Sequence, residues 1–307
     1  MEDSVAVALA HAILGISLQL SGDLGLARSE LEAALSHEPR SRRTTTIYLG
    51  VEGKNLAGAI LARNLWLLGH PAQAVERVRQ TVKDAAAMHH SLTLSIALIW
   101  GVSVFLWTGD LQSAEEHVDW LISHSESYSL APYRAVGRGF AGELAIRRGD
   151  ARGGVAMLEE CLETLHSMPY ELLTTQLNIS LVKGLSAVAR FADGIALIDD
   201  TMRRVNTNGD LLYVPELLRV KGGLLLSMPQ ARADEAEMHL MKSLELGRRQ
   251  GARAWELRTA TDLAVLLASQ RRPERGRALL QPVLEHFVEG SNTADLKAAE
   301  HLLATFG

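Results

Sequence analysis

The sequence predicts an all-α protein, a right-handed superhelix (α-solenoid) of about seven helical hairpins with a period of about 40 residues and a C-terminal capping helix. Three observations support this prediction. The 307 residues are 47% apolar with only 8 prolines, which suits a helix-rich chain with a sizeable core. A turn-like position recurs along the chain, and residues of constant type follow it at constant distances. No segment shows the alternation of a β-strand.

The recurring turn defines the repeat. Five residues after each turn the residue is Ala or Gly, and nine residues after it the residue is aliphatic. A glycine at the turn suits the left-handed conformation that ends a helix, and the small residue lets the next helix cross closely. The turns are separated by 47, 40, 40, 40, 42 and 40 residues, at Gly22, Gly69, Gly109, Gly149, Ala189, Ala231 and Arg271.

Each hairpin has one helix before the turn and one after it. The first helices are expected near 4–21, 46–68, 91–108, 131–148, 170–188, 212–228 and 253–269. The second helices are expected near 23–37, 72–88, 111–126, 151–166, 192–206, 232–250 and 273–289, and Pro71 and Pro273 suit the first turn of two of them. The single spacing of 47 places an insertion at His37 to Thr46, which contains Arg40, Arg42 and Arg43.

These elements cover nearly the whole chain, so we expect one solenoid domain over residues 1–307. Each hairpin leaves apolar faces uncovered until a neighbour stacks on it. The last helix caps the stack, and Thr293 or Asn292 suits its start. The hairpins are expected near 4–37, 46–88, 91–126, 131–166, 170–206, 212–250 and 253–289, and the cap at 294–306.

Two uncharged stretches, Ser4–Gly22 and Ser91–Gly109, have nearly the length of a membrane span. Both follow the repeat register, so we interpret them as buried helices and expect no membrane partner. The chain starts Met1-Glu2-Asp3 rather than with the basic residues of a secretory signal. Together with the single cysteine, this start indicates a cytoplasmic protein.

Composition and motifs argue against several kinds of site. One cysteine excludes a disulfide scaffold and a cysteine-rich zinc site, and a net charge of −5 argues against direct nucleic-acid binding. Gly137–Gly142 matches G-x-G-x-x-G, but no strand precedes it, so its glycines are interpreted as helix contacts. Gly50–Asn55 lacks the spacing of a phosphate loop. Cys161 falls in a column of small residues, which predicts a buried, unreactive thiol. No cofactor or metal is expected.

Histidines and arginines also have simple explanations. His117 and His124 can share a helix face, but solvated helix surface explains them better than a metal site. Arginines near helix ends are favourable in themselves, and a contact surface for an acidic partner is the alternative. The arginine cluster comprises Arg248, Arg249, Arg253, Arg258, Arg271, Arg272, Arg275 and Arg277.

The repeat resembles tetratricopeptide repeats of a longer, 40-residue variety. In the first hairpin Gly15 precedes Gly22 by seven residues, and Ala27 and Ala34 follow, as in that motif. A further resemblance rests on four segments, Leu65–Ala74, Tyr213–Gly222, Ala252–Ala264 and Phe287–Lys297. They look like the C-terminal helical-repeat arm of large bacterial signalling ATPases. In that family a winged-helix DNA-binding or nucleotide-cyclase domain and an NTPase domain precede the repeats.

Candidate binding residues lie near the starts of the first helices. Because the first helices of stacked hairpins line the concave face, rigid aromatics and mixed charges there suit a protein, peptide or small effector. Alternatively, the aromatics fill gaps between hairpins and the charges are solvated. The candidate residues are Lys54, Tyr133, Arg134, Tyr170, Glu171, Tyr213, Glu216, Arg219, Trp255 and Glu256.

The leading functional hypothesis is a non-enzymatic binding and regulatory module. The resemblance implies that binding would bias an attached NTPase, and hence transcription or cyclase output. The first helix is apolar nearly all round and has no polar cap, so it is expected to dock on a preceding NTPase domain or to form a homodimer. The alternatives are a free-standing scaffold and an α/α-toroid enzyme, which would need paired carboxylates on loops.

Overall fold

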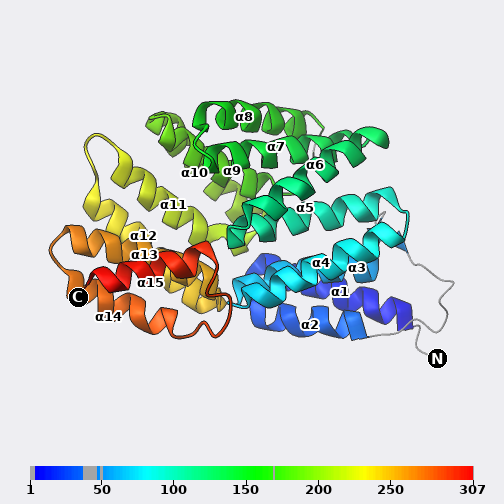
Figure 1. Cartoon of the computed structure of the whole chain (residues 1–307), viewed down its shortest axis with the longest axis horizontal. Helices are drawn as coiled ribbons and strands as arrows, with labels where there is room; N and C mark the ends of the chain where they lie inside the picture. Colours follow the sequence, from blue (N-terminus) through cyan, green and yellow to red (C-terminus); the bar gives the residue numbers. More distant parts are fainter. Residues whose placement is uncertain (1–3, 37–46, 49–50, 169, 307) are drawn as a thin grey trace.

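The computed structural model describes residues 4–36, 47–48, 51–168 and 170–306. It confirms an all-α solenoid of seven helical hairpins and a terminal helix (Figure 1). The expected insertion at 37–46, with its three arginines, lies outside the described residues. The helices are α1 (Ser4–Ser21), α2 (Leu24–Ser36), α3 (Gly53–Leu67), α4 (Pro71–Ala87), α5 (Ser91–Thr108), α6 (Leu111–Ser127), α7 (Ala131–Arg147), α8 (Ala151–Ser167), α9 (Thr174–Ala187), α10 (Phe191–Asn208), α11 (Val214–Ser227), α12 (Ala233–Gln250), α13 (Arg253–Ser269), α14 (Pro273–Leu284) and α15 (Ala294–Thr305).

Several predicted boundaries were wrong by a few residues. The helix expected from residue 46 begins at Gly53, where the Glu52 side chain accepts a hydrogen bond from the Asn55 amide. A short antiparallel pair, β1 (Ile47–Tyr48) and β2 (Val51–Glu52), precedes it, although no strand was predicted. The helix expected at 170 begins at Thr174, and a 3-10 turn, η1 (Leu211–Tyr213), precedes α11. The helix expected to reach 289 ends at Leu284, with Pro282 inside its last turn.

The turn positions behave as the repeat predicts. Six of the seven have positive φ, including the non-glycine residues Ala189 and Arg271, both at 61°. The small residues five positions later and the aliphatic residues nine positions later are all buried. Gly154 shows why small size is needed, because a Cβ there would lie 2.5 Å from the carbonyl oxygen of Gly142 on the partner helix. The two columns are therefore the seam of each hairpin.

The first helix of each hairpin lies inside the molecule. In α5 every residue from Thr93 to Thr108 is buried. It is the one helix among the described residues that is long and apolar enough to cross a membrane, but 89% of that stretch is buried inside the protein. Burial within the hairpin stack therefore explains its apolar character, as the repeat register predicted.

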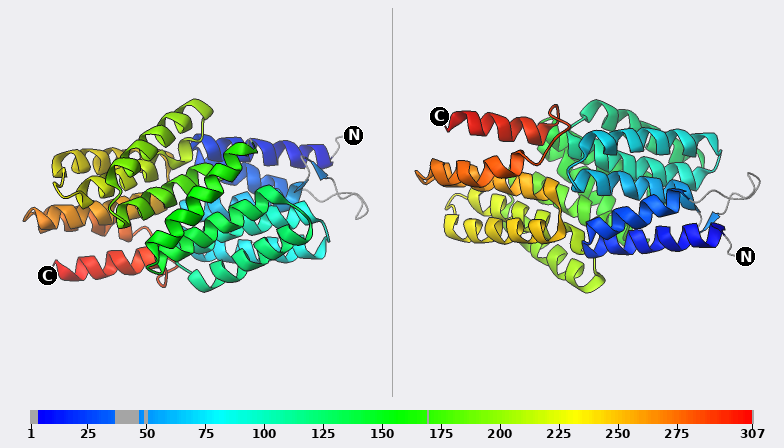
Figure 2. Two further views of the ribbon diagram at one scale, coloured as in Figure 1. Left: turned by 90° about the horizontal axis from the view of Figure 1, so that it is seen from above. Right: turned by 90° about the horizontal axis from the view of Figure 1, so that it is seen from below.

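The superhelix turns far enough for its ends to meet. Helix α13, in the seventh hairpin, contacts α3 in the second, and η1 packs on α1. A hydrogen bond also joins the Gln73 amide, in the second hairpin, to the Glu289 carboxylate, which follows the seventh. Figure 2, which views the molecule from above and from below, shows the C-terminal helices (yellow to red) meeting the N-terminal hairpins (blue to cyan) near the middle of the molecule. As a result, the first helices of distant hairpins cover much of the inner face of the solenoid.

Candidate functional site

A cluster of three tryptophans fills the inner face where the ends meet. Trp66 of α3, Trp107 of α5 and Trp255 of α13 have ring centroids 4.7, 4.9 and 5.5 Å apart. All three are almost completely buried. Aromatic contacts of this kind add to the free energy gained from burying the rings. The cluster therefore holds the second, third and seventh hairpins together.

Two arginines flank the tryptophan cluster. Arg63 is 2% exposed, and its guanidinium carbon lies 4.3 Å from the Trp100 ring centroid and 4.8 Å from that of Trp107. It also donates a hydrogen bond to the Tyr213 hydroxyl. Arg258 lies over the ring of Trp66 at 4.7 Å. Cation–π contact is stronger when the cation is removed from water, as it is at both positions.

Arg258 connects the tryptophan cluster to a large hollow between the inner helices. Its Nη2 donates to the Trp107 carbonyl oxygen at 2.8 Å, and its Nε donates to Asp295 Oδ2 at 2.8 Å. Asp295 is in α15, so one side chain ties the third hairpin to the terminal helix. The same guanidinium forms part of the wall of the cavity described next.

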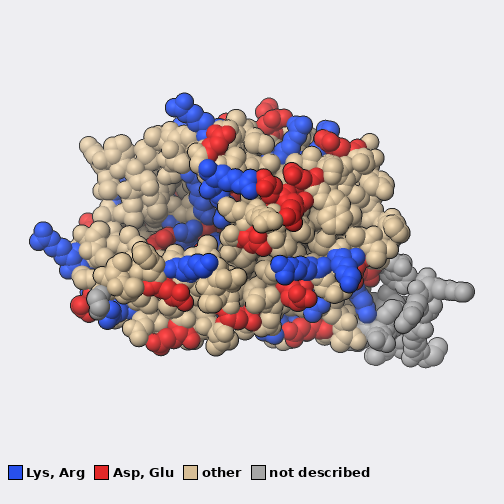
Figure 3. Space-filling view, in the orientation of Figure 1, with Lys and Arg blue, Asp and Glu red and all other residues tan. Residues whose placement is uncertain are grey.

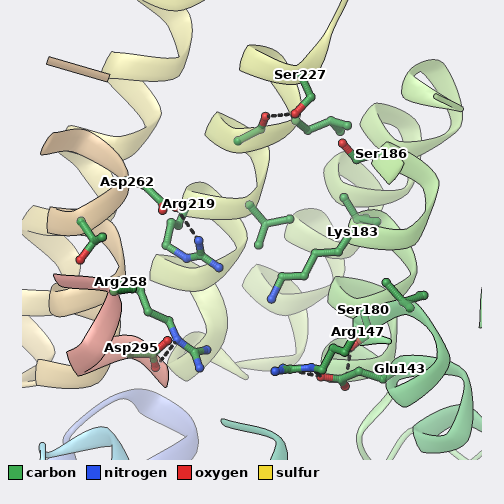
Figure 4. A pocket seen from close by; sticks show the side chains of 17 residues that line it. Glu143, Arg147, Ser180, Lys183, Ser186, Arg219, Ser227, Arg258, Asp262 and Asp295 are labelled. Atoms are coloured by element: carbon green, nitrogen blue, oxygen red, sulfur yellow. Dashed lines mark hydrogen bonds and ion pairs between the residues drawn. The ribbon is translucent and has the colours of Figure 1, made fainter. Parts of the chain in front are cut away.

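The cavity has a volume of about 500 Å³. It is hollowed between α7, α9, α11, α13 and α15, with charged side chains of both signs at its floor (Figure 3). Its size is within the range of sites for small molecules, ~300–1,000 Å³. Side chains from all five helices point into it (Figure 4). The charged lining residues are Glu143, Arg147, Lys183, Arg219, Arg258, Asp262 and Asp295.

A buried carboxylate beneath the cavity organises three of the cations. Glu216 is 2% exposed and accepts hydrogen bonds from Lys183 Nζ at 3.0 Å and from Arg219 Nε at 2.7 Å. The Arg258 guanidinium lies 3.8 Å away. Burial alone would raise the pKa of Glu216, but the charges of Arg219, Lys183 and Arg258 outweigh burial and hold that pKa well below its ordinary value. Glu216 is therefore a permanently charged centre.

Glu143 of α7 is a second carboxylate that neighbouring cations hold in place. Its Oε1 accepts from Arg147 Nη2 at 2.7 Å, and its Oε2 accepts from the Ser180 hydroxyl at 2.7 Å. Burial would raise the pKa of Glu143, but the charges of Arg147 and Lys183 and the Ser180 hydrogen bond lower it. Partial burial lowers the pKa of Lys183, Glu216 opposes that shift, and the neighbouring guanidinium groups add to it. The walls thus hold fixed charges of both signs.

The structure brings together some of the predicted site residues. Arg219 lines the cavity and Glu216 lies beneath it, whereas Tyr213 and Trp255 are buried in the core next to it. Tyr133 and Tyr170 pack on each other away from the cavity, with centroids 5.9 Å apart. The others lie at the helix starts: Lys54 is half-buried, Arg134 and Glu171 are exposed, and Glu256 pairs with Arg248 at 2.7 Å.

Sequence reasoning missed most of the cavity residues because it considered only the starts of the first helices. The cavity is lined by the second halves of α7 and α9 and by residues further along α11 and α13 than their first turns. Glu143 and Lys183 both fall six residues before their turns, at Gly149 and Ala189. Opposite charges at one repeat position of two inner helices are a signal that could have identified them.

The remaining motifs have structural roles. The glycines at 137, 139 and 142 lie within α7, where Cβ atoms would meet neighbouring helices. Cys161 is 2% exposed, and burial raises the pKa of its thiol to about 12. His117 and His124, expected on solvated surface, are instead half-buried and contact separate backbone carbonyls, at 2.7 and 3.0 Å. Within the described ranges, no group of three or more side chains has the arrangement of a metal site.

The arginine cluster is divided by the fold. Arg248 pairs with Glu256, Arg258 with Asp295, and Arg272 with Glu237 at 2.7 Å. Arg258 belongs to the cavity, whereas Arg271 and Arg275 are exposed around the last hairpin. The cluster is therefore not one continuous surface.

Comparison with known proteins places the fold. No family model matches the chain, and no curated protein matches its sequence. Three solved structures are similar: a Rap protein complexed with Competence and Sporulation Factor (TM-score 0.67, 11% identity, 97% of this chain and 76% of that one), the apo form of RapI (0.57, 9%, 97% and 99%) and aspartyl phosphate phosphatase F from Bacillus subtilis (0.59, 10%, 93% and 70%). At these identities the likeness shows the fold, a tetratricopeptide-like helical repeat.

Proposed function

We propose that the chain is a non-enzymatic regulatory module that binds a peptide, a segment of a protein or a small effector in the cavity. One observation carries this proposal. The tryptophan cluster fills the inner face between α3, α5 and α13, whereas the adjoining part is a hollow lined with charged side chains from five helices. Several polar groups converging on a concave space are typical of a ligand site.

The electrostatics favour binding over acid–base catalysis. A general acid at neutral pH needs a raised pKa, and a neighbouring cation instead lowers the pKa of a carboxyl group. The pKa values of both Glu143 and Glu216 are lowered, because each carboxylate is held by cations. These carboxylates suit a charged framework that recognises a ligand. The lowered pKa values of these two carboxylates therefore disfavour the α/α-toroid enzyme as an alternative.

The solved neighbours support a binding role for this kind of fold. One of them is complexed with Competence and Sporulation Factor, and it covers 97% of this chain. A fold of this shape therefore accommodates a regulatory factor in at least one protein. We extend that role to this chain as the sensor arm of a cytoplasmic, bacterial signalling ATPase or transcriptional regulator. A free-standing scaffold is the second candidate.

A second surface suits contact with another domain. Helix α1 exposes Ile13, Leu14 and Leu20 by 45%, 47% and 40%, and Leu26 of α2 is 56% exposed. Adjacent apolar side chains on the outside of a terminal hairpin are typical of a docking surface. We propose that this face, at the N-terminal end of the solenoid domain 1–307, packs on an NTPase domain or on a second copy.

Peptide selection tests the binding site. A library of short peptides is selected on the immobilised protein, and binders are compared between wild type and Lys183→Met. Loss of a desolvated charge contact is expected to weaken binding about tenfold or more. Lys242→Met is the matched control, since Lys242 is exposed on α12, outside the cavity. A library that yields no binder, or binders equally weakened by both variants, would contradict the proposal.

Sedimentation tests the docking face. If a second copy covers α1, the chain associates as its concentration rises, and Ile13→Ser with Leu14→Ser abolishes the association because it removes exposed apolar area. A control pair, Met238→Ser with Met241→Ser on α12, removes other exposed apolar side chains and should leave association unchanged. A wild type that stays monomeric at all concentrations rules out the homodimer.

A further inference from the structure

We propose that the ligand of this cavity is a short peptide with free termini, a zwitterion whose carboxylate lies against Lys183 and Arg147 and whose ammonium lies against Asp262 and Asp295. This inference rests on the proposed function and specifies the chemistry of the same site. Three observations support it: the exposure of the charged side chains in the cavity, the hydrogen-bonding capacity that they retain, and their positions on the cavity walls.

The most exposed charged groups of the cavity are of opposite sign. The side chains of Asp262 and Lys183 are 38% and 37% exposed. Arg147 and Asp295 follow at 28% and 25%. The other charged groups are buried deeper, at 15% or less: Arg219, Arg258, Glu143 and Glu216. A ligand that enters the cavity therefore meets Lys183 and Asp262 first. Arg147 adds a second, less exposed positive charge, and Asp295 adds a second, less exposed negative charge.

These four groups retain capacity for hydrogen bonds. An ammonium has three donors, and among the described residues Lys183 donates one hydrogen bond, to Glu216. Arg147 bonds Glu143 through Nε and Nη2, which leaves Nη1. Asp262 and Asp295 each accept one arginine through Oδ2. Among the described residues, their Oδ1 atoms have no hydrogen-bond donor, so each can accept an ammonium.

The two signs are on opposite walls. Figure 4 shows Lys183 and Arg147 reaching in from the side of α7 and α9, and Asp262 and Asp295 lying on the side of α13 and α15. Arg219 lies between these walls, fixed by Glu216 and Asp262. Counting the buried Glu216, the site holds four cations and four carboxylates. A site without net charge gives a simple anion or cation little attraction, whereas a dipolar ligand gains at both ends.

The apolar lining and the volume suit a peptide between the two ends. Ile146, Val182, Val220 and Leu224 line the cavity together with the charged groups. They can cover side chains or backbone that a bare ion would not fill. A volume of about 500 Å³ has room for a ligand larger than one amino acid.

Capping the ends of the ligand tests the inference without altering the protein. Pools of synthetic peptides, from dipeptides to pentapeptides, are titrated calorimetrically in four forms: free, N-acetylated, C-amidated and doubly blocked. For the tightest free peptide, each single cap is expected to weaken binding about tenfold or more, since it removes one charged contact. Free amino acids form the shortest probe in the series.

Variants then assign the ends. In Lys183→Met, C-amidation should weaken binding much less than it does in the wild type, because only Arg147 then faces the carboxylate, while N-acetylation keeps its full effect. In Asp262→Asn the pattern should reverse. Lys242→Met and Asp234→Asn, both exposed on α12, should keep the wild-type pattern. Thermal melts establish that each variant is folded. If one variant does not fold, the capping series on the wild type still decides whether both termini of the peptide are recognised.

The outcomes separate this inference from the proposed function. If peptides bind but neither cap changes their affinity by more than about twofold, the zwitterion inference is wrong, whereas the proposed binding function still holds. Sensitivity to one cap alone would overturn it as well. If no peptide binds in any form, the peptide-binding function fails together with the inference.

Discussion

Glu216 is the residue on which the charged site depends. It is 2% exposed and lies between a lysine and two arginines that come from three different hairpins. A buried ion pair adds little over an apolar replacement, but removing one partner leaves the others uncompensated. Glu216 therefore both stabilises the contact between hairpins and orients Lys183 and Arg219 toward the cavity.

Glu216→Gln should lower the free energy of unfolding at neutral pH by about 3–5 kcal/mol, because two buried arginines and Lys183 lose their shared counter-charge. The folded-state pKa of Glu216 lies below its ordinary value of 4.5. Its contribution is thus complete above that pH and is lost as the pH falls toward the folded-state pKa. Denaturant unfolding at several pH values measures this: the gap between wild type and variant should narrow in acid.

Glu245→Gln provides the comparison, since Glu245 is exposed on α12 and its replacement should change stability by no more than about 0.5 kcal/mol. If the two variants unfold alike at neutral pH, or if the gap for Glu216→Gln widens in acid, Glu216 does not have the role described here.

At the scale of the hairpin, the small residue after each turn decides how closely two helices approach. Between α7 and α8, Gly154 faces the backbone of Gly142, and a Cβ would also lie 2.6 Å from Ile146 Cγ1. Alanine in the same column elsewhere is fully buried without strain, as at Ala74 and Ala114. The column therefore tolerates a methyl group only where the helices are slightly further apart.

Gly154→Ala should destabilise the protein by about 1–3 kcal/mol, because overpacking outweighs the better helix propensity of alanine. Gly223→Ala in α11 is the contrasting change: no atom lies within 4 Å of its Cβ position, so it should stabilise the protein by about 0.5–1 kcal/mol. Thermal unfolding of both variants gives the answer. A Gly154→Ala variant as stable as the wild type, or more stable, would show that the α7–α8 contact can relax.

At the scale of the whole molecule, closure of the superhelix is the main feature. Stacked hairpins alone contact only their neighbours, and such an array has no reason to bring its ends together. Here Trp255 and Arg258 of the seventh hairpin contact Trp66 and Trp107 of the second and third. This long-range contact makes the cavity a bounded space, and it couples the ligand-facing Arg258 to the N-terminal hairpins.

Trp255→Ala should therefore cost about 3–5 kcal/mol and loosen the closure, since a fully buried side chain leaves a cavity between α13 and α3. Small-angle X-ray scattering is expected to show a larger radius of gyration, in addition to a lower melting temperature. Trp120→Ala is the control, since Trp120 is 37% exposed on α6. A Trp255 variant as compact as this control would mean that the other contacts maintain closure by themselves.

The sequence by itself determined the local architecture. The turn positions, the small and aliphatic columns, the hairpin order and the buried α5 were all predictable, because each depends on contacts within a hairpin or between neighbours. Only the tertiary structure decided which part of the inner face is filled and which is open. Trp255 and Tyr213 have the same residue types as groove-lining aromatics, yet they are buried. Closure follows from small rotations accumulated over seven hairpins, and these rotations leave no pattern at any single position. For the same reason, the cavity joins Glu143, Lys183, Arg219 and Asp262 from four hairpins that no local signal connects.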